Sequence, residues 1–186
     1  MSWSNFRKIR KKLLELAIRH EKVDEPIIEL LQLIFKNKNL VTLSSCSGRI
    51  VLIEFDFKGR KKTARFFRKW HRKVESEEVE LALAEHTGER TLWFKVEPFI
   101  LHVAARNINS ANTFLEKIRG CGVKRGGIQS IKKDKVTIEV QGNNQIIMPV
   151  NYVEGEWNKI IEIANTMLDD NFSVLKKLEK RFIKTQ

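Results

Sequence analysis

The sequence predicts an α+β protein: a single compact domain with a mixed, mostly antiparallel sheet flanked by N- and C-terminal helices. Apolar residues recur at helical spacing near both ends, polar and apolar residues alternate in the middle, and no internal repeat divides the 186 residues. We expect N-terminal helices over 1–38, a sheet core with the loops of the candidate site over 40–150, and a C-terminal helix over 155–186, all within the single domain 1–186.

Two helices are expected before the first strand. Residues 4–20 carry apolar side chains at helical spacing and cations on the remaining faces, which indicates a basic amphipathic helix. Asp24 is the expected N-cap of a second, more apolar helix, because Pro26 follows near its first turn. Asparagines after Lys36 are expected to end this helix.

Strands are predicted in the middle of the chain. Residues 40–45 and 50–57 are apolar runs on either side of a small polar turn, which is typical of a hairpin. Thr91 to Glu97 and Phe99 to Arg106 form two more strands. Pro98 separates them, and since proline cannot donate to a ladder, it marks an edge, a bend or a bulge.

A helix and further strands are predicted in the second half of the chain. A helix over 110–119 precedes strands at 128–131 and 136–141. Gly142-Asn143-Asn144 then turns the chain into residues 145–150, and we expect these to form a hairpin with the strand before the turn.

The chain carries 35 Lys and Arg against 23 Asp and Glu, for a formal net charge of +12. Nine cations and no acid lie between Phe57 and Val74, which favours contact with the phosphates of a nucleic acid. Trp70 suits either base stacking or core packing, whereas we expect Phe66 and Phe67 in the core. The residues expected to contact RNA are Lys61, Lys62, Arg65, Arg68, Lys69, Trp70, Arg72, Lys73, Lys124 and Arg125.

Several classes of protein are disfavoured. No apolar run reaches the roughly 18 residues that a membrane span needs, so no membrane partner is expected. The two cysteines lie far apart and no two histidines have ligand spacing, so we expect no metal and a reduced, cytoplasmic setting. No dinucleotide-binding or P-loop motif is present.

The turn between the first two strands is the leading candidate for a binding loop. It combines hydroxyls, a thiol, a glycine and a guanidinium, which suit an anion or a polar base edge, although Ser and Gly also simply shape turns. Cys46 is either a nucleophile or a packing residue, and Arg49 is the better candidate as an anion clamp. The loop consists of Ser44, Ser45, Cys46, Ser47, Gly48, Arg49 and Ile50.

Three further residues are candidates for proton transfer. His71 lies within the basic segment, where it either transfers a proton or contacts phosphate. His102 lies in an apolar strand, where a hydrogen-bonded core histidine is the alternative. Glu97 is either a structural partner of Lys95 or a base held ready by that cation.

Four stretches resemble, in order and spacing, the wybutosine-pathway tRNA methyltransferases, in particular their archaeal branch. They are Ser44 to Ile50, Phe94 to Val103, Gly122 to Ile128 and Ile147 to Val150. Departures from the family pattern occur at Phe66, Gly126 and Gly142-Asn143-Asn144.

The resemblance implies S-adenosylmethionine-dependent N4-methylation of a 4-demethylwyosine-type base at position 37 of phenylalanine tRNA. The partner is then the anticodon stem-loop, whose base 37 lies in a loop. Glu97, His102 and His71 become the expected catalytic residues, and the loop from Ser44 to Arg49, together with Lys95, becomes the expected substrate or cofactor site. A non-catalytic RNA-binding module and a cysteine-dependent hydrolase centred on Cys46 are the alternatives.

Overall fold

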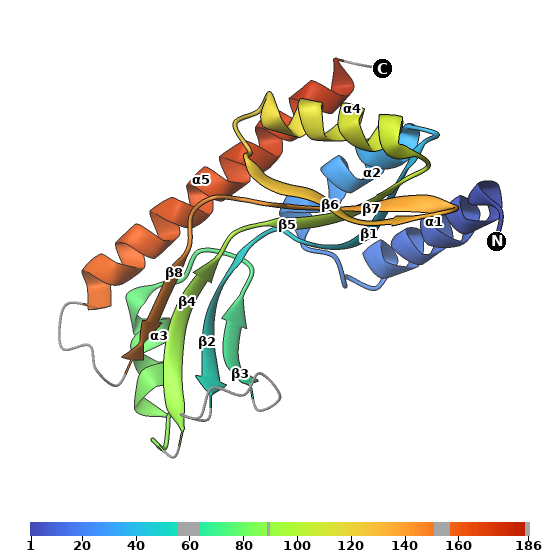
Figure 1. Cartoon of the computed structure of the whole chain (residues 1–186). Coiled ribbons are helices and arrows are strands. Elements are labelled where there is room, and N and C mark those ends of the chain that lie inside the picture. The colour runs from blue at the N-terminus through green and yellow to red at the C-terminus, as the bar shows by residue number, and fades with distance from the viewer. Residues whose placement is uncertain (56–63, 89, 151–156, 185–186) are drawn as a thin grey trace. The chain divides into compact units, whose positions relative to one another are not determined.

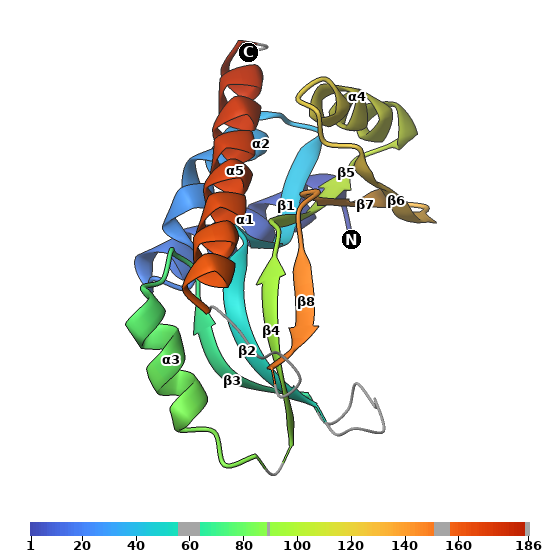
Figure 2. The same cartoon turned by 90° about the vertical axis from the view of Figure 1, so that its left-hand side faces the viewer.

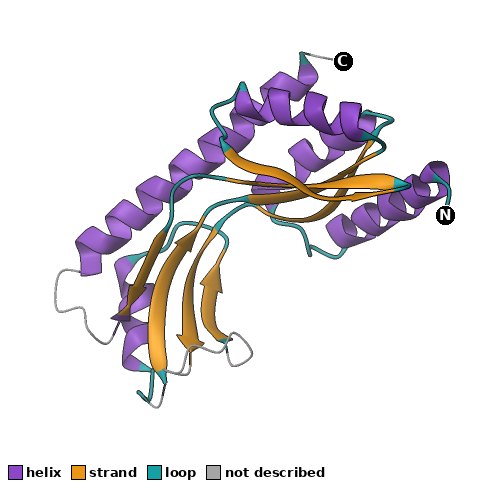
Figure 3. Ribbon diagram, viewed as in Figure 1, coloured by secondary structure: helices purple, strands orange, loops and turns teal. Residues whose placement is uncertain are grey.

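The structure, a computed structural model, describes residues 1–55, 64–88, 90–150 and 157–184. Helices at both ends of the chain and antiparallel strands between them confirm the predicted α+β class (Figure 1). The strands form two four-stranded sheets in place of the one sheet expected (Figure 3). The strand pairs within the described residues are all antiparallel.

The chain divides into two compact units, and each unit contains one sheet. Unit 1 comprises Met1–Ser47, Phe99–Asn143 and Asn171–Gln186. Unit 2 comprises Gly48–Pro98 and Asn144–Asp170. The expectation of a single domain over the whole chain stays a prediction.

Unit 1 is a sheet with helices packed on it. Its helices are α1 (Trp3–Arg19), the short 3₁₀ helix η1 (Glu25–Ile27), α2 (Ile28–Lys36), α4 (Ile108–Arg119) and the C-terminal part of α5 (Trp157–Ile183). Its strands, in spatial order, are β1 (Leu40–Cys46), β5 (Ile100–Ala105), β7 (Lys135–Gln141) and β6 (Arg125–Lys132). The middle strands β5 and β7 pair residue for residue from Ile100 to Ala105.

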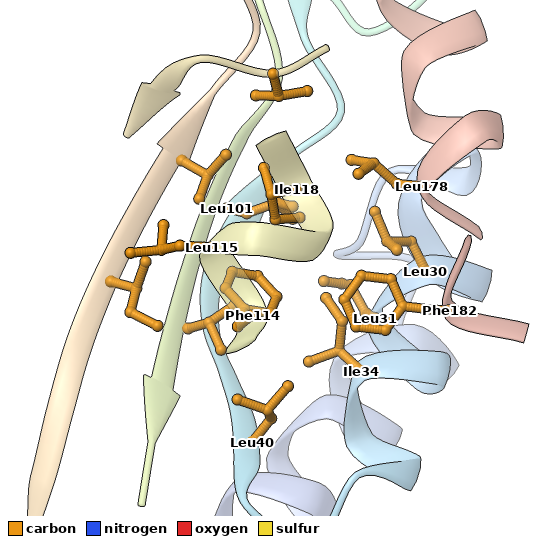
Figure 4. Packing of buried hydrophobic residues seen from close by; sticks show 14 of the residues in the cluster. Leu30, Leu31, Ile34, Leu40, Leu101, Phe114, Leu115, Ile118, Leu178 and Phe182 are labelled. Carbon is orange, nitrogen blue, oxygen red and sulfur yellow. The ribbon is translucent and has the colours of Figure 1, made fainter. Parts of the chain in front are cut away.

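The core of unit 1 follows from the alternation along β5, because Leu101 and Val103 point to one face and are fully buried. Helices α2, α4 and α5 cover that face with their apolar stripes, and the rings of Phe114 and Phe182 lie 5.9 Å apart there (Figure 4). Full burial of each such side chain contributes about 1.5 to 3 kcal/mol. This packing supports the strand that carries His102.

Unit 2 contains the second sheet. Its strands, in spatial order, are β3 (Arg65–Trp70), β2 (Arg49–Phe55), β4 (Thr91–Glu97) and β8 (Ile146–Pro149) (Figure 2). Helix α3 (Ser76–Ala84) begins with a capping box between Glu75 and Glu78, and the N-terminal part of α5 completes the unit. Asn165 of α5 both donates to and accepts from the backbone of Val74, at 2.8 and 3.0 Å.

Two predicted hairpins are wrong. β1 and β2 follow one another across Ser47 and Gly48, but β1 pairs with β5, whereas β2 pairs with β3 and β4. β8 pairs with β4 and not with β7, the strand before its turn. The physical reason is that turn residues determine where a strand ends, whereas its partner is chosen by packing between distant segments.

The backbone of Ser47 is held by side chains on both sides. Its N–H donates to Asp24 Oδ2 at 2.8 Å, and its carbonyl accepts from Asn171 Nδ2. The same Asn171 accepts from the N–H of Phe99 at 2.7 Å and is 7% exposed. Asp24 is the N-cap residue of η1, as predicted, but its side chain makes no cap hydrogen bond, because the carboxylate binds this distant amide instead.

We expect Asn171→Ala to lower the free energy of unfolding by about 2 to 4 kcal/mol, because a buried carbonyl and a buried N–H lose their partner. Urea denaturation measures this change. The exposed Asn112 of α4 provides the control, since Asn112→Ala should alter stability by no more than about 0.5 kcal/mol. Equal effects of the two substitutions would contradict a structural role for the Asn171 amide.

Candidate active site

Arg49, Glu97 and Lys95 form a charged cluster in unit 2. Arg49 on β2 lies directly opposite Glu97 on β4, and its Nε donates to Glu97 Oε2 at 2.7 Å. Lys95, two residues earlier on the same face of β4, donates to Glu97 Oε1 at 2.5 Å. All three side chains are about three-quarters buried or more.

These two cations set the charge state of Glu97. Burial by itself raises the pKa of the carboxyl, but hydrogen bonds from Lys95 and Arg49 outweigh it and hold the pKa below its ordinary value. An ionised carboxylate with both oxygens engaged is a weak proton acceptor. The geometry therefore suits Glu97 to anchoring Arg49, and its expected catalytic role stays a prediction.

A phenyl ring supports Arg49 as well. The guanidinium carbon lies 4.7 Å from the centre of the Phe66 ring, within the range of a cation–π contact. Phe66 is 51% exposed, so its predicted place in the core is wrong. Phe66 lies on the edge strand β3, which leaves its ring partly open to solvent. Together, Glu97 and Phe66 fix the position and plane of a charged fork suited to carboxylate or phosphate.

A second polar cluster, in unit 1, surrounds His102. Ser44 Oγ lies 2.9 Å from His102 Nδ1, and Glu139 Oε2 lies 2.7 Å from His102 Nε2. Gln141 Nε2 donates to the other oxygen of Glu139 at 3.0 Å. The pattern of β-pairing explains the arrangement, because His102 and Glu139 are direct partners across β5 and β7. Ser44 lies in the irregular part of β1, between Thr42 and Ser45.

The remaining loop residues have different environments. Ser45 Oγ is buried without a hydrogen-bond partner among the described residues, and Ser47 is fully buried. Cys46 is half-buried and outside any disulfide. Gly48 has φ +100°, a conformation that side chains disfavour. The boundary between the units falls after Ser47, so the serines and Arg49 belong to different units.

His71 is half-buried and directly follows the last residue of β3, Trp70. It belongs to unit 2 with Arg49 and Lys95, whereas His102 belongs to unit 1. The expected grouping of the loop with Glu97 and His102 in one site stays a prediction.

Part of the positive charge in the basic segment, the stretch between Phe57 and Val74, is matched by acids elsewhere in the chain. Three of its cations form ion pairs with acids outside the segment: Arg68 with Glu85, Arg72 with Glu78, and Lys73 with Asp169. Lys61 and Lys62 lie outside the described residues. Arg65, Lys69, Lys124 and Arg125 are exposed, and Trp70 is half-buried.

Helix α1 carries cations that the sequence reasoning did not place in the site. Lys8, Lys12 and Arg19 are exposed and form no ion pair with an acid in the described part of the chain. Arg10, in contrast, turns inward and donates to the carbonyls of Thr42 and Leu43 on β1. The helical spacing of Lys8, Lys12 and Arg19 places them on one face, which could have been found from the sequence.

Glu139 and Gln141 were also missed. A signal was available, because both lie on the polar face of the alternating strand from Val136 to Gln141. The sequence does not show which strand pairs with this one. Only the register between β5 and β7 places Glu139 beside His102.

Comparison with known proteins adds to this geometry. The family model described as "Methyltransferase TYW3" matches residues 5–184. A Pyrococcus horikoshii protein named "tRNA(Phe) 7-((3-amino-3-carboxypropyl)-4-demethylwyosine(37)-N(4))-methyltransferase 1" is 36% identical over 190 residues, covering 95% of this chain and 94% of that protein. A protein of Archaeoglobus fulgidus with the same name, apart from the final numeral, is 36% identical over 150 residues, covering 81% of this chain and 74% of that protein.

Solved structures agree. The structure of the PH1069 protein from Pyrococcus horikoshii matches with a TM-score of 0.87 at 36% sequence identity, covering 97% of both chains. A hypothetical protein from Aeropyrum pernix matches with a TM-score of 0.74 at 29% identity, covering 86% of this chain and 96% of that chain. No helix in the described part of this chain is long and apolar enough to cross a membrane.

The lowered pKa of Glu97 makes its contribution to stability depend on pH. That contribution is complete above the ordinary value of 4.5 and is lost as the pH falls through the lower value of the folded protein. We expect the difference in free energy of unfolding between wild type and Glu97→Gln to be largest near neutral pH and to shrink below pH 4.5. Urea denaturation across this range measures it, and a difference that stays constant down to about pH 3 would show that the ion pairs are unimportant.

Proposed function

Because this chain belongs to the Methyltransferase TYW3 family, we propose that it methylates N4 of 7-(3-amino-3-carboxypropyl)-4-demethylwyosine at position 37 of tRNA(Phe). The protein is a tRNA methyltransferase. The observation that carries the specific reaction is the 36% identity over 95% of the chain to a relative named for that activity. Nothing in the comparisons favours a non-catalytic module. A cytoplasmic location stays a prediction.

We expect S-adenosylmethionine to be the methyl donor. When bound, its sulfonium supplies the electrophilic methyl group. Each unit offers a residue that suits such a donor: in unit 1 the buried Ser45 hydroxyl lacks a partner among the described residues, and in unit 2 the fixed guanidinium of Arg49 suits a carboxylate. The aminocarboxypropyl group of the substrate also carries a carboxylate, so the carboxylate that Arg49 binds belongs either to the donor or to the substrate.

The main task of these residues is positioning. A nitrogen nucleophile must approach the methyl carbon in line with the breaking bond, and holding that geometry supplies much of the rate. Arg49 is suited to this task because Glu97 and the Phe66 ring restrict its movement. The nitrogen must also lose a proton, and Glu97 and His102 are the two acceptors predicted within the strands. Both oxygens of Glu97 are engaged by cations, whereas His102 Nδ1 faces only the hydroxyl of Ser44.

The decisive experiment incubates the protein with labelled methyl donor and tRNA(Phe) from cells that lack the N4 methyl group. We expect label in the anticodon loop, and Arg49→Lys should lower the rate at least about tenfold, since an ammonium cannot reproduce the planar fork. Arg119→Lys, at the exposed end of α4, is the matched control and should remain fully active. Absence of label from the wild-type reaction would overturn the proposed function.

The anticodon stem-loop is the part of the tRNA that we expect the protein to hold. Phosphate contacts supply most of the affinity for such a partner, and base 37 is reachable without opening a duplex. The exposed cations of α1 fit this role better than Arg72 and Lys73, whose charges are already matched by acids. We therefore propose that Lys8, Lys12 and Arg19 contact the tRNA backbone.

Replacing Lys8, Lys12 and Arg19 together with alanine should weaken tRNA binding and make its logarithmic salt dependence shallower by roughly one for every phosphate that these side chains neutralise in the wild type. Binding titrations at several salt concentrations measure both quantities. The control replaces Arg72 and Lys73, and we expect a smaller change because the partner acids already neutralise these residues. A control that weakens binding more than the α1 variant would place the docking surface on the basic segment instead.

A further inference from the structure

Both ring nitrogens of His102 have a defined partner. Nε2 faces Glu139 Oε2 at 2.7 Å, and Nδ1 faces Ser44 Oγ at 2.9 Å. Gln141 holds the second oxygen of Glu139 at 3.0 Å, so the carboxylate cannot rotate without losing that bond. Four side chains from three adjacent strands thus form one continuous chain of hydrogen bonds.

The chemistry of the partners determines the tautomer. An ionised carboxylate only accepts hydrogen bonds, so the neutral ring must carry its proton on Nε2 and donate it to Glu139. Nδ1 is then left with a lone pair, and the hydroxyl of Ser44 is the donor to it. A histidine held in this form is a base whose accepting nitrogen points at a hydroxyl.

One end of the chain of hydrogen bonds is more exposed than the other. Glu139, Gln141 and His102 are half-buried, whereas Ser44 is exposed. The other charged residues on the strands of this sheet are cations: Lys135 of β7, and Arg125 and Lys132 of β6. Helix α1 contributes Arg10, which donates to β1 carbonyls, and Glu15, which is paired with Lys11. Among the residues of the four strands of this sheet, Glu139 is the only acid. The exposed hydroxyl of Ser44 is therefore the end of the network that a substrate can reach.

We infer that Ser44 and His102 form a proton path from N4 of the substrate base, and that Glu139 is the positioning residue that sets the tautomer of His102. The inference rests on the proposed function. It adds to that function a route for the proton. It also adds two residues, Glu139 and Gln141, that orient the imidazole of His102 without touching the substrate.

The step balances as follows. The bond between N4 and the methyl carbon forms as the bond between sulfur and that carbon breaks, which leaves a neutral thioether. The N4–H proton passes to Ser44 Oγ while the hydroxyl proton of Ser44 passes to His102 Nδ1. The imidazolium that results is stabilised by the Glu139 carboxylate and later releases its proton to water.

Glu139→Gln tests the positioning role, because an amide can either donate or accept and no longer dictates the tautomer. By nitrogen NMR of the free protein at pH 8, we expect the wild-type ring to carry its proton on Nε2 and the variant to gain the Nδ1–H form. The variant's kcat should fall about 100-fold, whereas its KM for tRNA should stay within twofold. Glu116→Gln on the exposed surface of α4 is the matched control and should change none of these.

Ser44→Ala is the second variant, and circular dichroism checks that each variant is folded. We expect a lower kcat while the His102 proton stays on Nε2, since Glu139 is intact. An active wild type together with a fully active Glu139→Gln, or with an unchanged tautomer in that variant, would overturn the inference alone. A wild-type protein that transfers no methyl group to this tRNA would instead overturn the proposed function, while the NMR result would still report the orientation of His102.

Discussion

The buried amide of Asn171 is the interaction on which the rest of unit 1 depends. It satisfies the carbonyl of Ser47 and the N–H of Phe99, two backbone groups that lie 52 residues apart in the chain. Ser47 directly follows β1, and Phe99 directly precedes β5. The register between these strands places Ser44 beside His102, so a single side chain on α5 holds the ends of both strands that form the polar cluster.

Helix α5 carries a second asparagine whose side-chain amide binds backbone groups. Asn165, six residues earlier, makes two hydrogen bonds to the backbone of Val74 in unit 2. An asparagine amide can replace a missing peptide partner because it carries both a donor and an acceptor, and such bonds satisfy backbone groups that no strand reaches. The helix therefore contributes more than its apolar stripe: it completes the hydrogen bonding of irregular segments in each unit.

Two carboxylates perform comparable tasks, Glu97 in the cluster of unit 2 and Glu139 in the cluster of unit 1. Glu97 fixes the guanidinium of Arg49, and Glu139 fixes the imidazole of His102. Each acid has its second oxygen held by a neighbour on its own strand, Lys95 in one case and Gln141 in the other. The i and i+2 spacing of each pair puts the holding residue on the same face of the strand as the acid. A neighbour two residues away on the same strand thus fixes each carboxylate, and strand pairing places opposite it the side chain that the carboxylate orients.

The sequence by itself determined the fold class, most helix and strand positions and the identity of the polar loop, because periodicity and turn chemistry are local properties. It also identified Arg49, Glu97 and His102 as polar residues set within apolar strands. Only the tertiary structure decided that β1 and β2 pair with different strands, that Phe66 lies under Arg49, and that Glu139 faces His102. Those contacts join residues far apart in the chain, and their register follows from how helices and sheets pack, which no local pattern encodes.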